Sequence, residues 1–96
     1  MSKLIVNADD FGLHSAVNAA VIDGHRTGII TSTSLLAGGE AFSEAVSMAK
    51  NNPKLGIGVH IALVGGLKPV CNPAEVPSLL TSEGVFPETY IDCNAY

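Results

Sequence analysis

Two adjacent carboxylates stand at the end of an apolar run near the start of the chain. The stretch reads IVNADDFG, residues 5–12, and it places Asp9 directly beside Asp10. Neighbouring negative charges repel each other, so something nearby must offset that repulsion. A divalent cation would do so, with one carboxylate as its ligand and the other free to accept a proton from an attacking water. Spacing alone leaves an alternative open, because one carboxylate could instead cap a following helix.

A histidine further along the chain could join such a site. His60 lies toward the end of LGIGVHIAL, residues 55–63, an apolar stretch that predicts a strand. Alternation along a strand gives His60 only small neighbours on its own face, Gly58 and Ala62, and leaves the larger apolar side chains on the other face. A lone histidine of this kind is first interpreted as a hydrogen-bonded core residue. The acidic pair at a neighbouring strand end favours the ligand interpretation instead.

The elements that must position these residues alternate between strands and helices. Strands buried on both faces are predicted at residues 4–8, 29–36 and 55–63. The spacing of apolar residues predicts a first helix with Ser15 as its N-cap and Gly28 in the left-handed C-terminal position. A second helix is predicted over residues 40–52.

This order of elements is typical of a parallel α/β sheet or barrel. In such folds ligands bind at the carboxyl ends of the strands, which is where Asp9, Asp10 and His60 are expected to converge. Prolines and glycines interrupt the pattern afterwards and predict an irregular tail over residues 64–96. The predicted fold class is therefore α/β, of the parallel (β/α) barrel type, with about three βα units.

The composition limits the partners and the assembly of the chain. The 96 residues are 47% apolar and 15% charged, with a mean hydropathy of +0.35, whereas soluble domains are usually about 25% charged. The net charge is −4 and there is no Lys/Arg run, so nucleic-acid binding is not expected. Strands that are apolar on both faces would expose an edge and an apolar patch. A homo-oligomer or poor solubility is expected as a result.

The cysteines and the first residues bear on localisation. Cys71 and Cys93 form no C-x-x-C pair, and the absence of a disulfide framework favours a reducing compartment. The apolar run at the start is too short for a signal peptide or a membrane span. A cytoplasmic protein without a membrane partner is expected.

Four separated blocks of the sequence resemble the YdjC-like carbohydrate deacetylase family. They are VNADDFGL, VNAAVIDGHRTGIITSTSLL, NPKLGIGVHIAL and VPSLLTSEGVF, in this order between about residues 3 and 87. The resemblance implies that residues 1–96 are the N-terminal part of a single barrel-type deacetylase domain. It also implies that the reaction is hydrolysis of the N-acetyl group of an amino sugar or oligosaccharide.

The resemblance further implies roles for the site residues. Asp10 and His60 would be ligands of a divalent ion, magnesium or zinc, and Asp9 would be the catalytic base. The resemblance also implies a second histidine ligand further along, in the part of the family's length that these 96 residues do not include. His25 falls in the first helix, near the wrong end of the sheet, and a surface role is expected for it. The family often has serine where this chain has His14, and no role is carried onto that residue. We therefore expect the 96 residues alone to be inactive.

The alternative is a signalling module of the receiver type. Such modules also place an acidic pair after their first strand and bind magnesium there. They need an aspartate at the end of the third strand, where this chain has His60, and they have five strands, of which the sequence predicts three. The enzyme hypothesis is therefore favoured.

Overall fold

The computed structural model describes residues 1–95, which divide into two compact units. The first unit, Met1–His60, contains the strands and α-helices of the described chain. The second unit begins at Ile61 and contains short 3-10 helices. All residues of the candidate site lie in the first unit.

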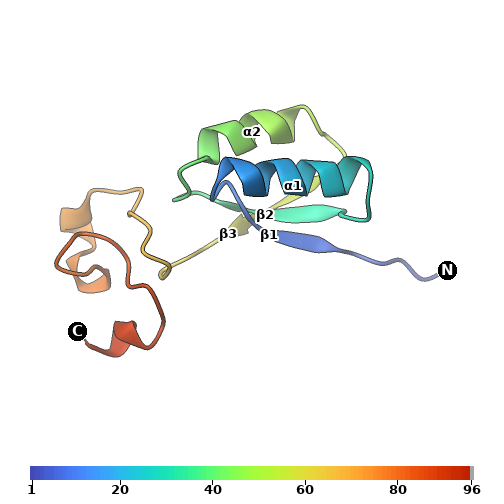
Figure 1. The fold of residues 1–96 in the computed structure, drawn as a ribbon. Coiled ribbons are helices and arrows are strands. Elements are labelled where there is room, and N and C mark those ends of the chain that lie inside the picture. The colour runs from blue at the N-terminus through green and yellow to red at the C-terminus, as the bar shows by residue number, and fades with distance from the viewer. Residues whose placement is uncertain (96) are drawn as a thin grey trace. The chain divides into compact units, whose positions relative to one another are not determined.

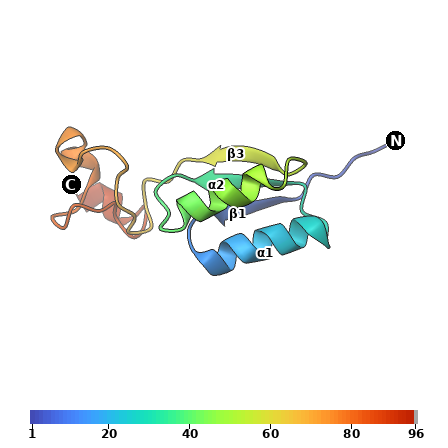
Figure 2. The same ribbon diagram turned by 90° about the horizontal axis from the view of Figure 1, so that it is seen from above.

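The first unit is a parallel sheet with two helices on one face. Its elements are β1 (Asn7–Phe11), α1 (Ser15–Arg26), β2 (Ser32–Leu36), α2 (Phe42–Lys50) and β3 (Gly56–His60). The three strands lie side by side in the order β1-β2-β3, and both neighbouring pairs are parallel. Both helices lie on the same side of the sheet (Figures 1 and 2).

This topology distinguishes between the two predicted classes. A receiver-type sheet has its first strand inside the sheet, in the order 2-1-3-4-5, and its helices cover both faces. Here β1 is an edge strand and each crossover returns over the same face, as happens when a parallel sheet curves toward a barrel. The predicted class, α/β of the parallel barrel type, is confirmed, and the receiver alternative does not fit.

The core of this unit lies between the helices and the sheet. It consists of Phe11, Val21, Ile22, Ala45 and Leu55. Phe11 and Ala45 are completely buried. Because Phe11 is the last residue of β1, its burial affects how the side chains of Asp9 and Asp10, directly before it, are directed.

The first strand was predicted at residues 4–8, but it lies at Asn7–Phe11. The prediction that both of its faces are apolar was also wrong. β1 begins at Asn7 because Leu4 and Ile5 lie beyond the amino end of β2, which starts at Ser32. Their side chains are 76% and 77% exposed there. On β1 and β2, the sheet face opposite the helices carries the polar side chains of Asn7, Asp9, Ser32 and Ser34, and only at the end of β2 does it carry an apolar one, the buried Leu36. The expectation that both faces are apolar is therefore wrong, because the true strand contains the alternating polar residues that follow the apolar run.

Both predicted termini of the first helix were also wrong in detail. His14, not Ser15, is the N-cap of α1, and its Nδ1 accepts a hydrogen bond from the backbone N–H of Ala16 at 3.1 Å. Neither carboxylate of the acidic pair caps this helix. Gly28 does not have a positive φ. A Cβ there would lie 2.8 Å from the carbonyl oxygen of Gly24, so close packing and not a left-handed turn requires glycine.

Between Ile61 and Ala95 the second unit contains three short 3-10 helices. They are η1 (Pro73–Glu75), η2 (Pro77–Leu79) and η3 (Asp92–Ala95). Both cysteines of the chain lie in this unit, and both are free and exposed. None of the helices formed by residues 1–95 combines the length and the apolar character needed to cross a bilayer.

Candidate active site

Asp9 and Asp10 form a bulge at the end of β1. The register with β2 shifts between Ala8 and Phe11, so that the two aspartates together stand opposite one residue of β2. Simple alternation would turn Phe11 away from the core, since Ala8 already faces the helices. The additional residue returns Phe11 to the helix-covered face. The bulge thereby keeps both carboxylates outside the core, and bulges commonly redirect side chains beside active sites.

The backbone of Asp10 is in the left-handed region, with a φ of 64°. That conformation brings Cβ close to the backbone and is uncommon for residues other than glycine. A tight turn follows, in which Leu13 N donates to Asp10 O at 3.0 Å and Gly12 has a φ of 103°. Such strain persists only where the surrounding structure imposes it.

At position 10, glycine should therefore give a more stable protein than alanine, the reverse of their usual order in a helix. We expect Asp10→Gly to unfold with a free energy about 1 kcal/mol higher than Asp10→Ala, because only alanine has a Cβ in the left-handed region. Urea denaturation in the presence of a chelator measures the difference without a metal contribution. At Ser47, an exposed helical position, the same pair should rank in the opposite order. If the alanine variant were the more stable one at both positions, the backbone of Asp10 would not be strained.

The structure brings Asp10 and His60 together at the carboxyl ends of β1 and β3. His60 Nδ1 lies 3.4 Å from Asp10 Oδ1, and the two side chains are 29% and 50% exposed. The Nδ1 atom itself is buried and has no hydrogen-bond partner among the described residues. A buried polar atom without a partner is costly. An imidazole nitrogen beside a carboxylate oxygen is, however, a donor set that suits zinc, so these residues fit a metal-ligand role.

Other potential ligands do not join this pair. In the described part of the chain, no group of three or more His, Cys, Asp or Glu residues could hold a metal ion. His25 lies near the amino ends of the strands, where it lines a pocket with Lys54 and its Nδ1 is 2.8 Å from Ile30 O. His14 is occupied as the cap of α1. Each of these two histidines thus contacts a backbone atom close to it in sequence.

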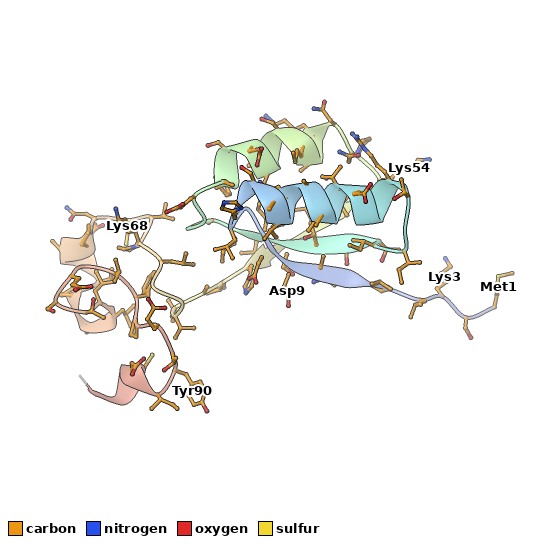
Figure 3. All side chains as sticks on the ribbon, in the orientation of Figure 1. Met1, Lys3, Asp9, Lys54, Lys68 and Tyr90 are labelled. Atoms are coloured by element: carbon orange, nitrogen blue, oxygen red, sulfur yellow. The ribbon has the colours of Figure 1, made fainter. Side chains whose placement is uncertain are left out.

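Asp9 lies on the sheet face opposite α1 and α2 (Figure 3). Its Oδ1 accepts a hydrogen bond from Asn7 Nδ2 at 3.1 Å. The Asn7 amide is itself fixed, because Nδ2 also contacts Ser34 Oγ at 3.0 Å and Oδ1 accepts from Ser32 Oγ at 2.8 Å. Asn7 thus orients the exposed carboxylate of Asp9. The sequence analysis missed Asn7, although its position two residues before Asp9 places both on one face of a strand.

A one-sided parallel α/β unit with an acidic bulge facing a histidine at its carboxyl edge is typical of the barrel class, in which ligands generally bind at the strand ends. The model of the YdjC-like protein family matches residues 3–95, and the chain belongs to this family. The resemblance seen in the four sequence blocks is thus confirmed.

Individual relatives carry names for carbohydrate chemistry. A carbohydrate deacetylase from Brevibacillus brevis is 48% identical over 84 residues, which cover 88% of this chain and 33% of the relative. A chitooligosaccharide deacetylase from Salmonella paratyphi B is 44% identical over 82 residues, or 85% of this chain and 31% of the relative. The chain spans about a third of the length of these curated relatives.

One solved structure is also similar throughout most of the chain. It is a crystal structure from Enterococcus faecalis V583, which carries a provisional name for cellobiose-phosphate cleavage. Its TM-score is 0.84 at 40% sequence identity, and the match covers 91% of this chain and 34% of that one. This chain is thus similar to that protein in three-dimensional structure as well as in sequence.

Proposed function

We propose that this chain supplies three βα units and part of the active site of a metal-dependent hydrolase that removes the N-acetyl group from an amino sugar or oligosaccharide. The buried, partnerless Nδ1 of His60 facing Asp10 at the carboxyl edge of the sheet carries the proposal. The names of the relatives from Brevibacillus brevis and Salmonella paratyphi B support the deacetylase activity.

In this proposal Asp10 Oδ1 and His60 Nδ1 hold a zinc or magnesium ion. When bound, the ion supplies Lewis-acid chemistry, which polarises a carbonyl. Gly58 has no side chain beside His60 and leaves room above β3 for a substrate. The acetamide group of the sugar would lie at this edge, between the two ligands and Asp9.

Asp9 is the proposed general base. Its carboxylate is exposed, and the hydrogen bond from Asn7 to Oδ1 fixes its orientation. Oδ2 is then available to accept a proton from the attacking water. The same carboxylic acid could return that proton to the nitrogen of the departing amino sugar, so that acetate and a free amine are the products.

A chimera tests the activity in a full-length protein. In it, the 84 matching residues of this chain replace the matching third of the Brevibacillus brevis deacetylase. We expect it to release acetate from oligomers of N-acetylglucosamine, to lose this activity with a chelator and to regain it with zinc or magnesium. New reducing ends are measured in parallel, since they would report cleavage between sugars. Reducing ends without acetate, or activity insensitive to the chelator, would contradict the proposal.

The metal site can be tested on the 96-residue chain itself. We expect it to bind zinc weakly, because it provides two protein ligands where a catalytic zinc normally has three. Asp10→Asn and His60→Ala should each remove measurable binding in a calorimetric titration, whereas Asp9→Asn should retain it. Zinc binding that survives the loss of both proposed ligands would place the metal elsewhere.

We also propose that the chain, expressed as it stands, self-associates. β3 is an edge strand, and Ile57 and Val59 on its helix-side face are 44% and 80% exposed because no helix covers them. An open edge beside apolar side chains favours pairing with another copy. Sedimentation at micromolar concentration should show an oligomer, and Val59→Lys should shift it toward monomer. A compact monomer of the unmodified chain would contradict this expectation.

A further inference from the structure

The side chain of Asn18 is completely buried in α1, and both ends of its amide are paired. Oδ1 accepts a hydrogen bond from Gly12 N at 2.7 Å. Nδ2 donates to Ala41 O at 3.1 Å and to Glu44 Oε2 at 2.7 Å. A buried amide is tolerated only when its polar atoms have partners. Here Gly12 belongs to the loop after β1, Ala41 to the loop after β2, and Glu44 to α2, which follows that second loop.

The two loops that Asn18 joins are the β1–α1 and β2–α2 connections at the carboxyl edge of the sheet. They also contact each other directly, because Ala41 N donates to Gly12 O at 2.9 Å. Gly39 approaches so closely that any Cβ there would collide with the Gly12 carbonyl. Asn18 is thus one part of a close junction that leaves the Gly12 backbone little freedom.

A short series of backbone contacts connects this junction to the candidate site. Gly12, held by Asn18, is inside the turn that Leu13 N closes on Asp10 O. That turn follows directly from the left-handed conformation of Asp10. The same conformation directs the Asp10 carboxylate toward His60 Nδ1. Strain of this kind needs an external constraint, and the amide of Asn18 provides one.

We propose that Asn18 is a positioning residue, which fixes the Gly12 turn and thereby holds the Asp10 carboxylate at His60 without touching metal or substrate. The proposal rests on the proposed function only in taking Asp10 as a metal ligand. A purely structural role would stabilise the fold without affecting the ligand geometry. The two roles differ in what happens to Asp10 when Asn18 is changed.

The direct test is Asn18→Asp in the full 96-residue chain. This variant keeps an acceptor for Gly12 N but replaces the amide donor with an oxygen that faces Ala41 O and Glu44 Oε2. Val21→Ala is the matched control, because Val21 is buried one turn further along the same helix and faces the core. With zinc chloride as the probe, we expect Asn18→Asp to lower the affinity about 10-fold or more. The control should change it less than about 2-fold.

A second readout needs no metal. Backbone NMR reports the φ of Asp10 through dipolar couplings and the protection of the Gly12 and Leu13 amides through hydrogen exchange. We expect Asn18→Asp to lose the left-handed conformation at Asp10 and to accelerate exchange at Gly12 and Leu13, whereas Val21→Ala keeps both features. If Asn18→Asp keeps the conformation and the protection, the proposal is overturned whatever zinc does. Failure of the unmodified chain to bind zinc counts against the proposed function alone.

Glu44→Ala covers the case in which Asn18→Asp does not fold. Glu44 is exposed on α2, so its removal leaves the core intact but takes one partner from the Asn18 amide. We expect exchange at Gly12 to accelerate several-fold while the Met48 amide in α2 remains unchanged. Equal protection of Gly12 in this variant and in the unmodified chain would count against the proposal.

Discussion

Asp9→Asn is expected to lower acetate release by the chimera about 10²–10⁴-fold, which is the range typical of a lost general base. The asparagine Oδ1 can still accept the hydrogen bond that Asn7 Nδ2 gives to Asp9, so the local geometry should persist. What disappears is an oxygen basic enough to take the proton of the attacking water. The effect should fall on kcat, since Asp9 is not a proposed metal ligand.

The controls for this prediction separate chemistry from folding. Zinc or magnesium should restore full occupancy of the metal site in Asp9→Asn without restoring the rate. Asp23→Asn, which changes an exposed carboxylate on α1, should leave the rate unchanged. Turnover of Asp9→Asn at the rate of the unmodified chimera would exclude Asp9 as the base.

Phe11→Ala should cost about 3–5 kcal/mol of unfolding free energy, the range found when buried aromatic side chains are truncated. Phe11 is completely buried in the core between α1, α2 and the sheet. Its burial also holds the register that creates the bulge, so the same substitution should weaken zinc binding at Asp10 and His60. Urea denaturation and zinc titration measure the two effects on one sample.

Leu4→Ala is the comparison for this substitution. Leu4 precedes the same strand but is 76% exposed, so its truncation should change the unfolding free energy by less than about 0.5 kcal/mol. If Phe11→Ala costs as little as Leu4→Ala, the burial of Phe11 is not what holds the end of β1. A large loss of stability with unchanged zinc affinity would mean that Phe11 stabilises the fold but does not position Asp10 and His60.

Local patterns in the sequence were sufficient for the fold class and for the convergence of Asp10 and His60. Short apolar runs and apolar residues at helical spacing, in alternating order, predicted a parallel α/β unit, since a doubly covered strand is apolar on both faces and a helix repeats every 3.6 residues. Parallel strands bring their carboxyl ends to one edge of the sheet, and on that ground Asp10 and His60 were expected to converge despite their distance in sequence. The structure places them 3.4 Å apart. Their role as metal ligands remains a proposal.

Strand boundaries and the polar face could not be obtained in the same way. The apolar residues Leu4 and Ile5 read as strand, yet they are exposed beyond the end of β2. A residue joins a sheet only where a partner strand is present to accept its hydrogen bonds, and the position of that partner is not written in the local pattern. The polar face of Asn7 and Ser34 followed from this shift.

The sequence by itself determined that two carboxylates and a histidine would meet at the carboxyl edge of a parallel sheet. Only the tertiary structure decided how they face one another. The bulge arises because Phe11 packs into a core that it shares with Ala45 and Leu55, which come much later in the chain. The left-handed Asp10 persists because Asn18, whose amide is paired with Ala41 and Glu44, holds Gly12. Both features thus depend on contacts with α2 and the segments beside it, and no local periodicity encodes such contacts.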